Sequence, residues 1–278
     1  MIKIGFIDYY LDEWHANNYP TWIAERLDGK YGVCYAYGKI NSPKVGGLTN
    51  QAWADKYGVE LVDSIEELIQ KSDRIVVLAP DNPETHEELT ELALQSGKPV
   101  YIDKTMAPDK AAALRIFANA DQYGTKCYST SALRFAEELA GIDKTQIHHV
   151  YTEGPGNFEV YAIHQIEQIV MLMETPAKRV MFTGDSVHPS LVIEFVDGRM
   201  AQLRQCNEMN FRLVTADVAN VGKEYVMRSD FFGRFIDNML EFFETEEVKV
   251  PHSQTVDVIA IREAGMRAAE KPFVWVEL

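Results

Sequence analysis

The sequence lacks several features that would place it quickly in a class of protein. Its three cysteines, Cys34, Cys127 and Cys206, are widely spaced and odd in number, so neither a disulfide framework nor a zinc-ligand spacing is predicted. No apolar run approaches the roughly 20 residues of a membrane span. The first ten residues lack the basic start and the cleavage site of a signal peptide. We therefore expect a protein of the reducing cytoplasm with no membrane partner.

Positive charge is also scarce. The 278 residues include 27 lysines and arginines against 42 aspartates and glutamates, which gives a formal net charge of -15. Such a chain repels phosphate backbones unless it carries a local basic stripe, and the sequence shows none. A nucleic-acid partner is therefore not expected, and a small-molecule substrate is the favoured partner.

What is present is an alternation of short apolar runs and helical patterns over residues 1–130. Continuous apolar runs such as Ile75–Ala79 are typical of parallel strands that helices cover on both faces. Strands are predicted at 2–8, 32–37, 75–79, 100–102 and 125–129, and helices at 19–27, 64–70, 83–96 and 107–123. This order predicts a Rossmann-like, doubly wound parallel sheet with right-handed crossovers.

The pattern of predicted strands and helices changes over residues 131–278. After a strand at 146–152 and a helix at 161–173, several strands follow one another, and a tight turn at Asp197-Gly198 predicts a hairpin. Helices at 230–244 and 253–269 and a strand at 273–277 end the chain. We expect a second, α+β domain with a mostly antiparallel sheet and helices on one side.

Several stretches, in this order and spacing, resemble one family of enzymes. They are Ala79-Pro80-Asp81-Asn82 with His86, the run Ala93–Val100 followed by Asp103-Lys104-Thr105-Met106-Ala107, Arg134-Phe135, His164-Gln165-Ile166-Glu167, and the two-helix and strand layout of 231–278. Together they resemble the glucose–fructose oxidoreductase and inositol 2-dehydrogenase family, abbreviated Gfo/Idh/MocA. The resemblance covers nearly the whole chain.

The resemblance implies an enzyme that uses NAD or NADP to transfer hydride to or from a hydroxyl of a sugar-like molecule or polyol. By position, Lys104 would hydrogen-bond the reacting oxygen and the cofactor ribose, and His164 would accept the proton. Arg134, in one of the matching stretches, would contact the substrate. Apart from the resemblance, Tyr161 is a further candidate substrate contact, because its hydroxyl could lie near His164. The resemblance also implies a homo-oligomer that associates through the second-domain sheet.

The residues themselves support a role for Lys104. It follows an apolar strand at the carboxyl end of the predicted parallel sheet, where open α/β sheets bind ligands. A lysine there could stabilise alkoxide charge on a substrate. The alternative is a surface lysine paired with Asp103 or Asp109.

His164 and Glu167 lie three residues apart, so both project from one side of the predicted helix. A carboxylate near the imidazole would fix its tautomer and suit it as a general base. The alternative is a structural histidine, because the family's aspartate four residues earlier is Val160 here. These two side chains are too few for a zinc site, so no metal is predicted.

The nucleotide site departs from the dinucleotide-binding pattern. Three glycines should follow the first strand, and the corresponding positions are Asp8, Tyr10 and Glu13. Their acidic and bulky side chains oppose a bound diphosphate. Lys39, after the second strand, could meet a 2′-phosphate and favour NADP, or could be a solvated loop lysine. The candidate cofactor contacts are Asp8, Tyr9, Tyr10, Lys39, Pro80, His86 and Asp103.

Three hypotheses follow. The first is an NAD(P)-dependent oxidoreductase with an unusual cofactor loop, in which Lys104, His164 and Glu167 are catalytic. The second is a degenerate, non-catalytic binding or scaffold subunit that has lost dinucleotide binding. The third keeps Lys104 and His164 for a redox-neutral proton abstraction or elimination.

Overall fold

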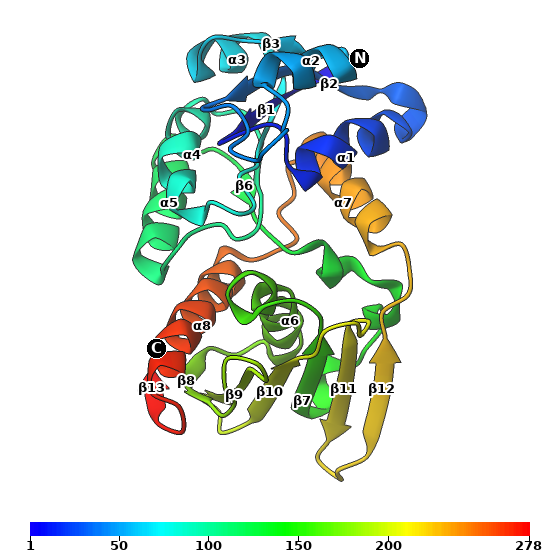
Figure 1. Cartoon of the computed structure of the whole chain (residues 1–278). Helices are drawn as coiled ribbons and strands as arrows, with labels where there is room; N and C mark the ends of the chain where they lie inside the picture. Colours follow the sequence, from blue (N-terminus) through cyan, green and yellow to red (C-terminus); the bar gives the residue numbers. More distant parts are fainter. The chain divides into compact units, whose positions relative to one another are not determined.

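The computed structural model describes residues 1–278, which form two compact units (Figure 1). The first unit comprises Met1–Thr130 and Ile236–Pro251, and the second comprises Ser131–Phe235 and His252–Leu278. The segment Ile236–Pro251, which the sequence analysis placed in the second domain, therefore packs with the first unit. The predicted fold class is confirmed, with a Rossmann-like parallel sheet and a second, mostly antiparallel sheet.

The first unit contains a six-stranded, all-parallel sheet in the order β3-β2-β1-β4-β5-β6. Its strands are β1 (Ile2–Asp8), β2 (Tyr31–Gly38), β3 (Glu60–Leu61), β4 (Arg74–Val77), β5 (Val100–Ile102) and β6 (Cys127–Tyr128). Its helices are α1 (Trp14–Ala24), α2 (Asn50–Tyr57), α3 (Ile65–Lys71), α4 (His86–Gln95), α5 (Lys110–Tyr123) and most of α7 (Phe231–Thr245), with short 3-10 turns at Leu27–Gly29 and Pro83–Thr85.

The parallel sheet forms because its central strands are apolar on both faces. Ile4, Phe6 and Ile7 of β1 and Ile75 and Val76 of β4 are fully buried. Helices α1 and α7 cover one face of the sheet, and α4 and α5 cover the other (Figure 1). The order of the strands reverses between β1 and β4, which makes the carboxyl ends of these two strands the topological switch point of the sheet.

Side-chain caps set where several helices begin. Ser64 Oγ accepts a hydrogen bond from the backbone N–H of Glu67, as the capping-box pattern predicted. Helix α1 differs from the prediction, because it begins at Trp14 rather than Tyr19 and ends at Ala24. Its N-cap is Glu13.

The second unit contains a seven-stranded sheet in the order β12-β11-β7-β10-β9-β8-β13, in which only the β7–β10 pair is parallel. Its strands are β7 (Ile147–Gly154), β8 (Ala177–Phe182), β9 (Ser190–Phe195), β10 (Met200–Gln205), β11 (Arg212–Asp217), β12 (Gly222–Val226) and β13 (Trp275–Glu277). Its helices are α6 (Phe158–Met173) and α8 (His252–Glu270), with 3-10 turns at Ala132–Phe135, Glu137–Leu139 and Lys144–Gln146. The predicted hairpin joins β9 to β10, and Gly198 there has a φ of 86°.

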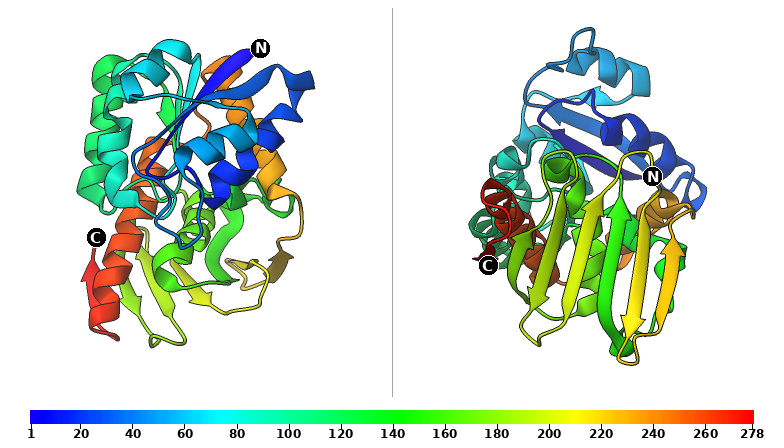
Figure 2. Two further views of the ribbon diagram at one scale, coloured as in Figure 1. Left: turned by 45° about the horizontal axis from the view of Figure 1, so that its top comes forward. Right: turned by 60° about the horizontal axis from the view of Figure 1, so that its bottom comes forward.

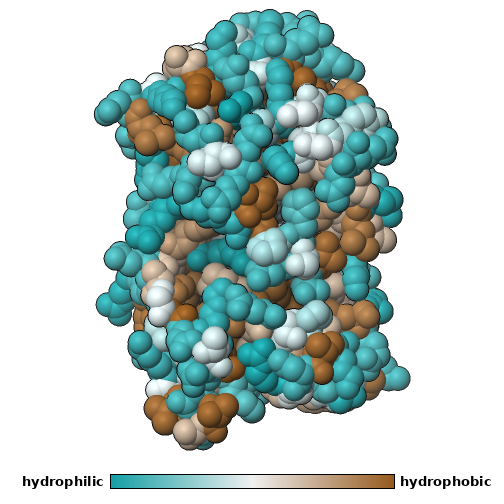
Figure 3. Space-filling model, turned by 180° about the vertical axis from the view of Figure 1, so that it is seen from behind, coloured by the Kyte–Doolittle hydropathy of each residue, from teal (hydrophilic) through white to brown (hydrophobic).

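Helices α6 and α8 cover one face of this sheet, and the opposite face is open (Figure 2). Along β9 every second side chain is buried and the alternate ones are only half-buried, which matches a sheet packed on one side. No helix of the chain is long and apolar enough to cross a bilayer. The visible surface is mainly hydrophilic with small, separate hydrophobic patches (Figure 3), in keeping with the net charge of -15.

Candidate functional site

The carboxyl ends of β1, β4 and β5 bring most of the predicted residues of the first unit to one edge of the sheet. Asp8 ends β1, Pro80 follows β4, and Lys104 follows β5. These strands are neighbours and parallel, so their ends lie along the same edge, where sheets of this class bind ligands.

Lys104 is half-buried at this edge, and the peptide bond that follows it is cis. The two acids that could have held it as a surface ion pair have other partners. Asp109 caps α5 by accepting from the N–H of Ala112 at 2.7 Å. Asp103 is buried, and its carboxylate is bonded to Nδ1 of His15 and to the hydroxyl of Tyr101.

The buried pair of His15 and Asp103 was not predicted from the sequence. His15 lies in the first turn of α1 and stacks on Tyr19, with ring centroids 5.1 Å apart. Burial raises the pKa of Asp103, but the charges of His15, Lys104 and His86 outweigh it and hold the pKa below its usual value. The pair therefore fixes the start of α1 to the end of β5. Its only sequence signal is a histidine just after the first strand.

His86 is fully buried and cannot reach a ligand directly. Its Nδ1 lies 2.9 Å from the carbonyl oxygen of Thr105, and its Nε2 contacts the carbonyl oxygen of Leu78. Burial lowers the pKa of His86. It joins α4 to the segments that follow β4 and β5. Because Thr105 is the neighbour of Lys104, this contact can position the backbone of Lys104.

The loop after β1 is closed by its own acidic side chain. Glu13 lies in extended backbone as the N-cap of α1, and its carboxylate accepts from the N–H groups of His15, at 2.7 Å, and of Ala16. The side chain is 2% exposed. These amides point to where a helix N-terminus holds the diphosphate of a dinucleotide.

Asp8 adds a second buried carboxyl at the same place. Its Oδ1 accepts from the N–H of Ala79 at 3.0 Å, while its buried Oδ2 has no hydrogen-bond partner. Ala79 has a φ of 68°, in the left-handed region that few residues other than glycine adopt. Burial and the nearby carboxylate of Glu13 raise the pKa of Asp8 well above its usual value.

The other predicted cofactor residues are also engaged within the unit. Lys39 is exposed, and its Nζ lies 2.6 Å from both carboxylate oxygens of Glu88. Tyr9 is half-buried. Tyr10 is buried beneath the ammonium group of Lys44, and burial raises the pKa of Tyr10 to about 12. None of these contacts leaves a side chain available to bind a phosphate group.

Asn50, at the start of α2, holds this loop closed and was missed by the sequence analysis. Its Oδ1 accepts from Leu11 N–H, and its Nδ2 donates to the carbonyl oxygens of Gly38 and Ile40. Gly38 is required there, because a Cβ at that position would lie 2.5 Å from Asn50 Nδ2. As the structure stands, the loop does not fit a dinucleotide diphosphate at the start of α1.

In the second unit, His164 projects from α6 and is half-buried. Ser131 Oγ lies 2.7 Å from its Nδ1, and the rings of Tyr161 and Phe211 contact the imidazole edge-on. The side chain found against Nδ1 is therefore a serine that the sequence analysis did not single out. A hydroxyl at Nδ1 can fix the ring orientation and leave Nε2 for proton transfer.

Arg134 and Glu167 form a buried ion pair. The distance from Arg134 Nη1 to Glu167 Oε1 is 2.5 Å, and the two side chains are 8% and 3% exposed. Arg134 Nη2 also donates to Oε1 of Gln254 in α8. Arg134 thus links the segment after Thr130 to both helices of the second unit, and the ion pair gives Arg134 and Glu167 a structural role.

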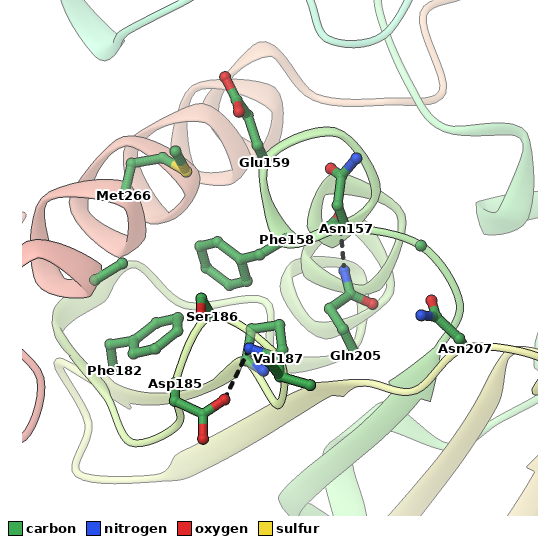
Figure 4. Close-up of a pocket in the computed structure, with 13 residues that line it drawn as sticks. Asn157, Phe158, Glu159, Phe182, Asp185, Ser186, Val187, Gln205, Asn207 and Met266 are labelled. Atoms are coloured by element: carbon green, nitrogen blue, oxygen red, sulfur yellow. Dashed lines mark hydrogen bonds between the residues drawn. The ribbon is translucent and has the colours of Figure 1, made fainter.

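A cavity of about 470 Å³ lies at the start of α6 (Figure 4). Phe158 and Phe182 form its apolar wall, with rings perpendicular and 5.4 Å apart. Asn157, Glu159 and Asp185 supply polar groups at its rim. None of the predicted site residues lines this cavity. The structure brings together no group of three or more histidine, cysteine, aspartate or glutamate side chains that could hold a metal ion.

The fold, with candidate residues around Lys104 in the first unit and around His164 in the second, defines a two-unit α/β protein with a Rossmann-like sheet. Comparison with protein families matches residues 44–131 to the Gfo/Idh/MocA family, described as an oxidoreductase family with an NAD-binding Rossmann fold. No curated protein matches the sequence.

Solved structures match over the full chain. The myo-inositol 2-dehydrogenase of Lactobacillus plantarum superposes with a TM-score of 0.80 at 14% identity, covering 100% of this chain and 99% of that one. An apo scyllo-inositol dehydrogenase of Lactobacillus casei gives 0.79 at 17%, covering 99% and 98%. The WlbA dehydrogenase of Bordetella pertussis, solved with NADH and UDP-GlcNAcA, gives 0.77 at 14%, covering 100% and 98%. The resemblance recognised from the sequence is therefore confirmed: residues 44–131 match the family model, and the whole chain has the fold of these dehydrogenases at low sequence identity.

Proposed function

We propose that this protein is an NAD(P)-dependent oxidoreductase that transfers hydride to or from a hydroxyl of a sugar-like molecule or polyol. The observation that carries the proposal is the match of residues 44–131 to an NAD-binding oxidoreductase family, which includes the motif of Asp103 and Lys104. The position of Lys104 at the carboxyl end of β5 supports it. The names of the dehydrogenases with this fold support a polyol or sugar as the substrate class.

Lys104 and His164 have separate roles in this proposal. The ammonium group of Lys104 hydrogen-bonds the reacting oxygen and stabilises its developing negative charge. His164 takes the hydroxyl proton on Nε2, with Ser131 holding Nδ1. Glu167 acts through the fold, because its ion pair with Arg134 fixes the helix that carries His164. Tyr161, 40% exposed beside His164, is the best placed of the predicted substrate contacts.

The test is a screen of inositols and sugars with NAD and with NADP, followed by the appearance of reduced nicotinamide. Lys104→Ala should lower kcat by about a hundredfold or more. His164→Ala should lower it by about 100- to 10,000-fold, the range for loss of a general base. Lys110→Ala and His148→Ala, at exposed positions of the same two units, are the matched controls. Product without any change in the nicotinamide would replace this function by a redox-neutral one.

Two finer points belong to the same proposal. A homo-oligomer would use the open face of the second-unit sheet, and sedimentation of the purified protein tests it. A cytoplasmic location accords with three free cysteines. The choice between NAD and NADP is left to the screen, because Glu88 already neutralises Lys39.

A further inference from the structure

We infer that Glu13 is an internal substitute for the diphosphate of the cofactor, so that the chain binds NAD(P) weakly until this side chain is displaced or replaced. The inference rests on the proposed function only in taking a dinucleotide as the ligand. It makes Glu13 a specificity-determining residue, which neither the family match nor the solved relatives assign.

The first support is geometric. A helix N-terminus binds an anion through free backbone N–H groups in its first turn. In α1 the amides of His15 and Ala16 are already bonded to the two oxygens of one carboxylate. A diphosphate oxygen would have to take the place that Glu13 Oε1 and Oε2 now fill.

The second support is the burial of the carboxylate. Glu13 is 2% exposed, and its carboxylate accepts from the backbone N–H groups of His15, at 2.7 Å, and of Ala16. His15 is in turn held by Asp103. To admit a diphosphate, Glu13 must break two hydrogen bonds to the backbone and leave a position from which solvent is nearly excluded.

The third support is Asp8, at the end of the adjacent strand. Its Oδ1 accepts from Ala79 N–H, but its Oδ2 is buried without a partner, so the position next to the helix start already holds a carboxyl group that the fold satisfies only in part. Burial and the nearby carboxylate of Glu13 already raise the pKa of Asp8, so a diphosphate would bring further negative charge to a place that disfavours it. The occupied amides of α1, the burial of Glu13 and the carboxyl group of Asp8 therefore all oppose binding of the diphosphate.

The experiment measures binding by calorimetry, not turnover. Wild type, Glu13→Gly and Glu13→Gln are titrated with NADH, NADPH, ADP and adenosine. Glycine frees both amides and is well tolerated at an N-cap, so this variant should fold. Glu13→Ser, with a short capping hydroxyl, replaces it if it does not. Glu25→Ala, which removes the same charge at the exposed other end of α1, is the matched control.

We expect Glu13→Gly to bind NADH or NADPH and ADP about ten- to a hundredfold more tightly than wild type, from the charge-assisted bonds that a phosphate would gain. Adenosine, which has no diphosphate, should show no gain. Glu13→Gln should improve less than Glu13→Gly, because its amide oxygen still occupies an N–H group. Glu25→Ala should bind like wild type.

The outcomes separate this inference from the proposed function. Equal, measurable affinity of wild type and Glu13→Gly for NADH or NADPH overturns the inference and leaves the function standing. Binding by Glu13→Gly alone supports the inference and removes cofactor dependence from the natural chain. Failure of wild type, Glu13→Gly and Glu13→Ser to bind either cofactor overturns both.

Discussion

Replacing Glu167 by alanine should strongly destabilise the second unit. Its carboxylate is 3% exposed and lies 2.5 Å from the guanidinium of Arg134, which is itself 8% exposed. Removing one partner of such a pair leaves a buried, uncompensated charge, which costs about 3–5 kcal/mol of the free energy of unfolding. Glu167→Gln should cost less, about 1–3 kcal/mol, because its amide oxygen can still accept from Arg134.

Urea denaturation followed by circular dichroism gives these free energies. The double variant Arg134→Met/Glu167→Met removes both charges and should cost less than the sum of the single changes, because neither charge is left unpaired. Glu87→Gln is the control, since it breaks the pair of Glu87 with Arg115, whose side chains are 45% and 58% exposed. That variant should unfold at the same urea concentration as wild type.

A loss below about 1 kcal/mol for Glu167→Ala, or single losses that simply add in the double variant, would show that the buried ion pair does not stabilise the second unit. A variant that keeps its stability but loses turnover, with a shifted pH profile, would instead show that Glu167 acts directly on His164. The two results therefore distinguish a positioning role from a catalytic one.

Two further predictions concern pH. Burial raises the pKa of Asp8, so its ionisation opposes folding: the cost is absent below the usual aspartate pKa and grows as pH rises. Asp8→Asn, which keeps an acceptor for Ala79 N–H, should therefore gain stability relative to wild type between about pH 4 and about pH 7 in urea titrations, and a constant difference would contradict this. Although burial opposes it, hydrogen bonds from Ser229 Oγ and from the N–H groups of Arg228 and Ser229 lower the pKa of Glu138 to about 2. This stabilisation is present above the usual glutamate pKa and is lost as pH falls, so Glu138→Gln should be less stable at neutral pH and equal to wild type near pH 2, as thermal unfolding at each pH would show.

The sequence predicted the fold well because the pattern of burial is local. Apolar runs such as Ile75–Val77 become strands covered on both faces, and the turn at Asp197-Gly198 becomes a hairpin. The start of α1 was wrong for a local reason too. Proline usually opens a helix, whereas Pro20 lies inside α1, and glutamate is an uncommon N-cap that here accepts two backbone hydrogen bonds.

The candidate site was less predictable because its contacts are distant in sequence. His15 and Asp103 are 88 residues apart, and Ser131 and His164 are 33 apart. Neither spacing leaves a periodic signal. Arg134 was expected at a substrate because a family motif contains it, and only the structure shows its guanidinium enclosed by Glu167 and Gln254.

The missing glycines and the intact fold are compatible because the fingerprint glycines serve the ligand more than the sheet. They let the backbone approach a diphosphate, and the β1–α1 connection uses them for its tight turn and for close packing of the helix on the strand. Here Glu13 supplies the helix cap, and Asn50 closes the loop against β2, so the backbone N–H groups that a ligand would satisfy are satisfied internally. Such a loop stabilises the apo protein at the expense of ligand affinity. Asp8 Oδ2 is the one buried side-chain oxygen of the loop left without a hydrogen-bond partner, so the internal contacts satisfy the loop almost but not entirely.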